Sequence, residues 1–167
     1  MKKTGFTLIE LLVVVLIIGI LAAIAVPKYT TAVKVSKVKS ALSIARSISD
    51  AQQAFYLANG RYTKELDELD LSLGDIIGSE ETSTSQNRYE TSWGNLYLYN
   101  NANYISLTFN DTPSTIDFYG GQSKTKSGIT YYGVCYKDNA VCSKFGGQIY
   151  VSQDSHWSGT NVYYMTN

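Results

Sequence analysis

An apolar stretch from Phe6 to Val26 begins almost at the N-terminus of this sequence and holds one charged residue, Glu10. As a helix, these 21 residues would be about 31 Å long, which is enough to cross a lipid bilayer. A carboxylate inside such a segment costs roughly 2.5–3.5 kcal/mol on insertion scales unless it is neutralised or paired. No basic residue lies between Phe6 and Val26, so the partner of Glu10 must come from outside the stretch.

Two ordinary interpretations of this N-terminus leave Glu10 without a partner. The first is a secretory signal peptide, because Lys2 and Lys3 precede the apolar stretch and Ala23-Ile24-Ala25 is typical of a cleavage site before Val26. The second is an uncleaved anchor that holds a domain to the membrane.

A third interpretation places a cut between Gly5 and Phe6, so that the whole apolar helix stays on the mature protein. The cut creates a new amino group at Phe6, four residues from Glu10 and also available to Glu10 of a neighbouring subunit. We favour this interpretation because it alone supplies the carboxylate with a cation.

The segment Gly5-Phe6-Thr7-Leu8-Ile9-Glu10 closely resembles the cleavage motif of type IV prepilins and of the pseudopilins of type II secretion. The resemblance is strong over residues 1–56 and covers only the general layout beyond them. It implies a leader peptide of residues 1–5, cleavage by a membrane-embedded prepilin peptidase, and N-methylation of Phe6. It also implies assembly into a helical filament, in which we expect Glu10 to face the Phe6 amine of a neighbour.

The helical pattern continues past a transmembrane or filament-core helix of residues 6–26 into an amphipathic helix of residues 27–57. Pro27 removes a backbone donor and predicts a kink, with Gly19 as a second weak point. Apolar residues then recur at helical spacing and form one stripe: Val38, Ala41, Ile44, Ala45, Ile48, Ala51 and Phe55. Asn59-Gly60 indicates the end of the helix.

Residues 58–94 are interpreted as a connecting loop between helix and sheet, with one or two helical turns near Leu66 and with Thr63 as a candidate N-cap. Residues 79–95 are polar and predict loop. Residues 95–167 predict an antiparallel sheet with a covered face. The expected strands are Asn95–Tyr99, Tyr104–Phe109, Thr115–Tyr119, Ile129–Tyr136, Gln148–Val151 and Asn161–Met165. The expected class is therefore α+β, a long N-terminal helix packed against a C-terminal antiparallel sheet, as the resemblance to pilins also implies.

Cys135 and Cys142 are the only cysteines, with six residues between them. One pair, with a single histidine (His156) elsewhere, is too sparse for a zinc site, so no metal is expected. An even pair in an extracytoplasmic domain predicts a disulfide. It resembles the disulfide that bounds a C-terminal loop in many type IV pilins.

Charge indicates interactions between proteins more than with nucleic acid. Loss of Lys2 and Lys3 would leave 12 basic against 14 acidic residues. Five basic residues and no acidic residue lie between Lys28 and Arg46, directly after the apolar stretch. Seven acidic residues and no basic residue lie between Glu65 and Glu81. These two groups predict either solvated surfaces or a lateral contact between subunits. Nucleic acid is expected, if at all, only through an assembled filament.

We found no motif of an enzyme, phosphate-binding loop or cofactor site in the sequence. The favoured function is a structural subunit of a type IV pilus-like filament. Alternatives are a major or minor pseudopilin of a type II secretion system and a membrane-anchored extracytoplasmic binding module that does not polymerise. The expected location is the inner membrane, with the N-terminus cytoplasmic before cleavage, and then a cell-surface filament or a periplasmic pseudopilus. The other expected partners are copies of the same chain, prepilin peptidase and the assembly machinery.

Overall fold

The structure is a computed structural model that describes residues 5–71, 73–74, 76–120, 124–126, 129–145, 149–151 and 161–165. The chain divides into two compact units, Met1–Val33 and Lys34–Asn167, and each is described by itself. Helix α1, Leu8–Asn59, contributes its first part to one unit and its second part to the other.

In the first unit, α1 contains Pro27 without an interruption of the helix. Pro27 lacks a backbone N–H, and its carbonyl oxygen accepts two side-chain hydrogen bonds. The hydroxyls of Thr30 and Thr31 both donate to it at 3.0 Å. Such side-chain bonds to a helical carbonyl often accompany bending. The kinks expected at Gly19 and Pro27 stay predictions.

In the second unit, one face of α1 is buried, and the apolar stripe predicted from the sequence supplies most of it. The buried residues are Val38, Ala41, Leu42, Ala45, Ile48, Ser49 and Gln52. The helix ends at Asn59, where Gly60 follows with a φ of 71°, a conformation that glycine adopts without steric cost. The predicted stop signal at Asn59-Gly60 is confirmed.

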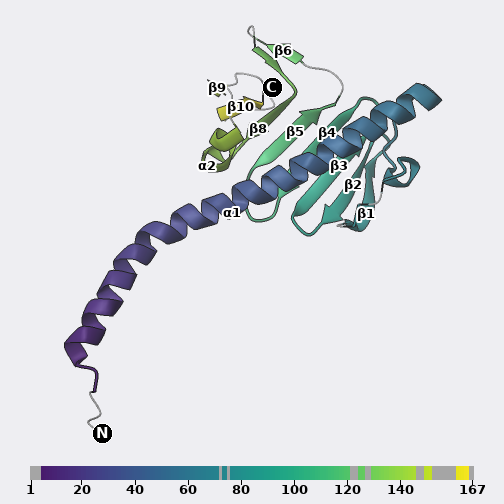
Figure 1. The fold of residues 1–167 in the computed structure, drawn as a ribbon. Helices are drawn as coiled ribbons and strands as arrows, with labels where there is room; N and C mark the ends of the chain where they lie inside the picture. The colour runs from purple at the N-terminus through teal and green to yellow at the C-terminus, as the bar shows by residue number, and fades with distance from the viewer. Residues whose placement is uncertain are drawn as a thin grey trace. The chain divides into compact units, whose positions relative to one another are not determined.

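The second unit contains an eight-stranded antiparallel sheet with the order β1-β2-β3-β4-β5-β8-β10-β9 (Figure 1). The first five strands follow each other in sequence: β1 (Ile76–Ser83), β2 (Gln86–Thr91), β3 (Gly94–Tyr99), β4 (Tyr104–Phe109) and β5 (Thr115–Tyr119). The other strands of this sheet are β8 (Gly133–Tyr136), β9 (Ile149–Val151) and β10 (Asn161–Met165). A separate pair is formed by β6 (Lys124–Lys126) and β7 (Ile129–Tyr131). Two short helical segments, α2 (Asn139–Cys142) and η2 (Ser143–Phe145), follow β8.

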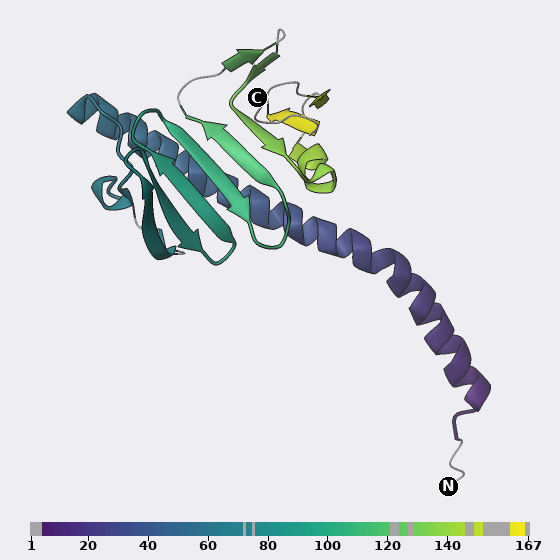
Figure 2. The same cartoon turned by 180° about the vertical axis from the view of Figure 1, so that it is seen from behind.

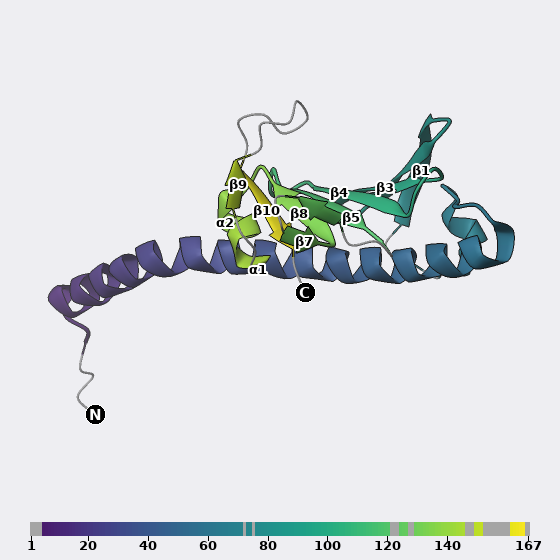
Figure 3. The same cartoon turned by 90° about the horizontal axis from the view of Figure 1, so that it is seen from above.

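Within this unit, the helix and the sheet form two layers, which Figure 3 shows edge-on, and Figure 2 shows the sheet face that α1 does not cover. Alternate residues of the central strands point toward the helix and are fully buried: Leu96, Leu98, Ile105, Leu107 and Ile116. This alternation is the pattern expected for a sheet with one covered face. The expected α+β class is confirmed.

Hydrogen bonds around Asn103 hold the sheet against the helix. The Nδ2 atom of Asn103 donates to the Ser49 carbonyl at 3.0 Å, and the Gly120 nitrogen donates to the Asn103 carbonyl at 2.9 Å. A Cβ atom on Gly120 would lie 1.9 Å from the Ser49 Oγ. Glycine is therefore required here by the close approach of sheet and helix.

The prediction of loop for residues 79–95 is wrong, because β1 and β2 form a hairpin there and β3 begins at Gly94. The inward positions of β2 are Asn87, Tyr89 and Thr91, so two of the three buried residues are polar. Hydrophobic alternation, on which the sequence prediction rested, is therefore weak in this strand. The strand expected at Ile129–Tyr136 is also divided, into β7 and β8 with Tyr132 between them.

The helical turn expected near Leu66 is present as η1, Leu66–Glu68, but Thr63 is not its N-cap. Glu65 occupies the cap position without a side-chain cap. The Thr63 Oγ1 instead accepts from the N–H of Glu65 itself at 2.9 Å, just before η1 begins. The buried Gln52 pairs with both backbone groups of Thr63, since its Nε2 donates to the carbonyl at 2.5 Å and its Oε1 accepts from the N–H at 3.1 Å. This pair binds the chain after α1 back onto the helix.

Candidate processing and assembly segment

Thr7 and Glu10 form a reciprocal cap at the start of α1. The Glu10 Oε2 accepts from the Thr7 backbone N–H at 2.8 Å and from the Thr7 hydroxyl at 2.7 Å. The Thr7 Oγ1 in turn accepts from the Glu10 N–H at 3.3 Å. This is a capping box, in which the first and fourth residues of a Thr-x-x-Glu sequence satisfy backbone donors that the helix leaves open.

The capping box is a partner of Glu10 that the sequence analysis missed. The signal for it is Thr7-Leu8-Ile9-Glu10, a Thr-x-x-Glu sequence directly before an apolar run. The cap satisfies hydrogen bonds and brings no positive charge beyond the partial charge of the helix N-terminus. A pairing of Glu10 with the Phe6 amine of another subunit therefore stays a prediction.

The peptide between Gly5 and Phe6 lies outside the helix, and both residues are exposed. A Cβ atom on Gly5 would meet no other atom within 4 Å, and the Phe6 side chain is 80% exposed. Nothing in this fold requires glycine at position 5. A requirement for glycine would therefore arise in a partner, such as a protease subsite that admits no side chain.

Large apolar side chains from Phe6 to Val26 are exposed by between 46% and 92%. Within the described residues, α1 is the one helix long and apolar enough to cross a membrane, with a mean hydropathy of 3.1 over its best window and none of that window buried. An N-terminal signal sequence has the same properties, so length and composition alone do not separate the two. An exposed apolar surface of this size requires lipid or other protein to cover it.

The predicted disulfide is confirmed in the second unit, where Cys135 of β8 is bonded to Cys142 of α2 with Cα atoms 5.4 Å apart. Both residues are buried against the core. A bond that closes so short a loop stabilises the fold by roughly 2–3 kcal/mol on the chain-entropy model.

Asp138 organises the loop that this disulfide closes. Its Oδ1 accepts from the backbone N–H groups of Ala140 and Val141 at 2.9 and 3.2 Å, and its Oδ2 accepts from the Thr112 hydroxyl at 2.5 Å. Burial opposes ionisation of Asp138, but the hydrogen bonds outweigh it and lower the pKa of the carboxyl. The neighbouring Asp111 forms an ion pair with Lys37 of α1, which lowers the pKa of Asp111. These contacts join the helix, the turn between β4 and β5, and the disulfide loop.

Tyrosines gather on the sheet face opposite α1. The Tyr104 ring lies 4.7 Å from that of Tyr99 and 5.3 Å from that of Tyr119, centroid to centroid. The buried Asp117 follows in the next row of the same face, and its Oδ1 accepts from the Ser106 hydroxyl at 2.8 Å. Burial and the nearby Asp117 raise the pKa of Tyr104 far above its ordinary value, so this phenol stays neutral. Sequence patterns gave no sign that Asp117 is buried.

No group of three or more potential metal ligands occurs among the described residues. His156 lies outside them. Within the described residues, the most extensive surface for interaction with other molecules is the exposed apolar part of α1.

Comparison with known proteins supports the resemblance at the N-terminus. Residues 1–26 match the prokaryotic N-terminal methylation motif. The type IV major pilin protein PilA of Myxococcus xanthus is 41% identical over 68 residues, which are 41% of this chain and 31% of that protein. PilE of Neisseria gonorrhoeae is 41% identical over 63 residues, or 38% of each chain. The type IV major fimbrial protein FimA of Dichelobacter nodosus is 38% identical over 87 residues, 52% of this chain and 48% of that protein.

The chain thus spans about a third to a half of the length of the curated relatives it matches. No solved structure matches it significantly. The chain is thus similar, over part of its length, to type IV major pilin and fimbrial proteins.

Proposed function

We propose that this chain is a structural subunit of a type IV pilus-like filament. It is made as a membrane-anchored precursor, cut between Gly5 and Phe6 by prepilin peptidase, methylated at the Phe6 amine and assembled through the apolar part of α1. The observation that carries the proposal is the exposed apolar helix, which begins directly after a methylation motif. The curated relatives are named as major pilin and fimbrial proteins, which favours a pilus over a pseudopilus.

The physical argument starts from the different surfaces of the two units. Residues 6–26 present apolar side chains on every side of the helix, which suits lipid in the precursor and neighbouring helices in a filament core. The second unit buries its own apolar core and presents polar loops, as a subunit head at a filament surface must. Transfer from lipid to a helical bundle keeps the apolar surface covered throughout, and no catalytic step by this chain is needed.

Glu10 has a place in this scheme in both environments. In the membrane, the capping box satisfies its hydrogen bonds. In the filament, the Phe6 amine created by cleavage supplies a cation, and attraction between the two groups is strong in an apolar core. The pair also provides an axial register between subunits, because a carboxylate buried without a cation is costly.

The experiment follows the mature N-terminus. The full chain is expressed in a bacterium with a type IV pilus system, and the mature protein is examined by intact-mass and N-terminal analysis and by electron microscopy. We expect a chain that begins at Phe6 with one N-methyl group, and filaments on the cell surface. Gly5→Leu should leave full-length precursor in the membrane, whereas Gly74→Ala, a glycine with open space around it, should be processed normally. A mature start at Val26 would identify a secreted protein and contradict the proposal.

A further inference from the structure

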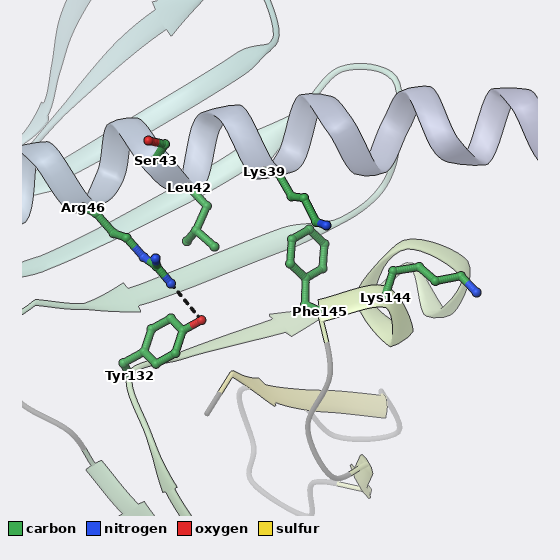
Figure 4. Close-up of a pocket in the computed structure, with 7 residues that line it drawn as sticks. All are labelled: Lys39, Leu42, Ser43, Arg46, Tyr132, Lys144 and Phe145. Atoms are coloured by element: carbon green, nitrogen blue, oxygen red, sulfur yellow. Dashed lines mark hydrogen bonds between the residues drawn. The ribbon is translucent and has the colours of Figure 1, made fainter. Parts of the chain in front are cut away.

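A groove of about 380 Å³ lies in the second unit between α1 and the segment that follows the disulfide. Figure 4 shows its lining, in which Lys39 and Arg46 of α1 lie on either side of the apolar Leu42, while Lys144 of η2 extends outward beyond Phe145 at the rim. Ser43 and Tyr132 complete it. The groove is therefore positively charged with an apolar component.

Arg46 is held in place by the side chain of Tyr132. One Nη atom donates to the Tyr132 hydroxyl at 3.0 Å, and the guanidinium lies 5.1 Å from the centroid of the Tyr132 ring. Tyr132 is itself fixed, because its backbone N–H donates to the Met165 carbonyl at 3.0 Å and its carbonyl accepts from the Tyr119 N–H at 2.8 Å. The cation is thus oriented without being neutralised.

The three cations of the groove form no ion pair within the residues that the structure describes. No carboxylate is among the residues that line it. The two ion pairs found in the described ranges, Lys37 with Asp111 and Arg61 with Glu68, involve none of its three cations. The complementary ligand is therefore an anionic segment that also presents an apolar side chain.

This chain carries such a segment in residues 65–71, which contact β2, four strands away from β8 in the sheet. We call these residues the acidic segment. Asp67 and Asp70 are exposed and form no ion pair within the described part of the chain, and Leu71 is only partly buried. The segment lies beside β2, because the Leu66 N–H donates to the Tyr89 hydroxyl at 3.0 Å and Asn87 donates to Glu65 at 2.9 Å.

The acidic segment cannot fill the groove of its own molecule. Tyr132, in the groove, directly precedes β8, whereas the acidic segment contacts β2, and β3, β4 and β5 lie between those strands in the sheet. At about 4.8 Å per strand, four steps separate the two by roughly 19 Å. Only another molecule can bring these charges together.

We propose that the groove receives the acidic segment of a second copy of the chain, with Asp67 and Asp70 facing Lys39, Arg46 and Lys144. Two different surfaces of one subunit, four strands apart along its sheet, form a head-to-tail contact, which repeats without closing and extends an open filament. The inference rests on the proposed function and deepens it, since it names the surfaces by which the heads associate. Charge complementarity of this kind also selects the orientation of the contact.

The test is a charge exchange in the full chain, expressed in a host that assembles the wild-type protein into filaments. Arg46→Glu alone, Asp67→Lys alone and Asp70→Lys alone should each lower the yield of sheared filaments about tenfold. Combining Arg46→Glu with one of the two aspartate changes exchanges a single charge pair and should restore the yield to within about twofold of wild type. Lys137→Glu, an exposed lysine outside the groove, is the matched control and should leave the yield unchanged.

Zero-length carbodiimide cross-linking of wild-type filaments gives an independent readout. We expect covalent dimers in which Lys39 or Lys144 is joined to Asp67 or Asp70, identified by mass spectrometry. Normal wild-type filaments without such a linkage, and no rescue by the charge exchange, would overturn this inference and leave the proposed function standing. No filaments from the wild-type chain would overturn both. If Arg46→Glu keeps the filament yield but abolishes binding of double-stranded DNA to the filaments, the groove takes a polyanion and the inference is wrong.

Discussion

Glu10 shows how one side chain can serve two environments. The structure gives it hydrogen bonds within the capping box, whereas the proposed filament supplies a full positive charge from another subunit. The two roles differ in what they require. A cap needs an acceptor of suitable length, which glutamine also offers, whereas an ion pair needs the carboxylate.

We therefore expect Glu10→Gln to give processed, membrane-resident subunits and few or no filaments, because it keeps the cap and removes the charge. Glu10→Ala should behave in the same way. Thr7→Val removes the capping hydroxyl at a cost of about 0.5–2 kcal/mol of helix stability but keeps the charge, so filaments should still form. Electron microscopy of sheared cells, with immunoblots for processing, measures both effects. A wild-type yield from Glu10→Gln would eliminate the ion pair from this account.

Asp138 provides a test of the disulfide loop by pH. Because the folded-state pKa of its carboxyl is lowered, its contribution to stability is present above the unfolded-state value of about 4 and is lost as pH falls through the folded-state pKa. Asp138→Asn should therefore be less stable at pH 7, by about 1 kcal/mol or less. It should also lose less stability than wild type on acidification below pH 4. Thermal unfolding at a series of pH values measures this; parallel curves for both proteins would contradict the prediction.

At the level of elements, the second half of α1 acts as the cover of a sheet. Its buried face combines a stripe of small and branched apolar residues with Gln52, which holds the chain after the helix. The helix is also joined to the sheet through Asn103 and Ser49, one turn before Gln52, so the C-terminal part of the interface carries specific hydrogen bonds.

Ile48 is fully buried at the centre of this interface. Ile48→Ala should lower the free energy of unfolding by about 2–5 kcal/mol, through lost apolar contact and the cavity left behind. Asp50→Ala, on the exposed side of the same helical turn, should change it by no more than about 0.5 kcal/mol. Urea denaturation of both variants gives the comparison, and equal effects would show that this face does not form the core.

At the scale of the whole molecule, the division at residue 34 separates a segment that cannot cover its own apolar surface from one that can. The first requires lipid or other subunits. The second unit contains its own apolar core, a disulfide and the hydrogen bond from Asn103 to Ser49 of α1.

A fragment of residues 34–167 should therefore be a soluble monomer when produced in the periplasm. It should have one disulfide, and its intact mass should be two hydrogens below that of the reduced form. Light scattering and mass spectrometry without reductant test both points. Aggregation of the fragment would argue against a self-sufficient head, and two alkylatable thiols in the folded protein would argue against the disulfide.

The sequence alone determined the features that depend on local pattern. The apolar stretch, the motif at Gly5 to Glu10, the stripe from Val38 to Phe55 and the strands rich in alternating apolar residues are all readable because side-chain periodicity reports burial. The end of α1 at Asn59-Gly60 and the pairing of two cysteines were also predictable. The capping box of Thr7 and Glu10 is also a local pattern, a Thr-x-x-Glu sequence, and was predictable in the same way.

Tertiary structure decided the features in which polar residues are buried or distant surfaces are arranged. The β1–β2 hairpin escaped prediction because Asn87 and Thr91 occupy its inward positions, where burial depends on partners from other elements. The burial of Asp117 and the bond from Gln52 to Thr63 are likewise set by contacts across the fold. The placement of a basic groove and an acidic segment four strands apart along one sheet follows from strand order, which no local pattern encodes.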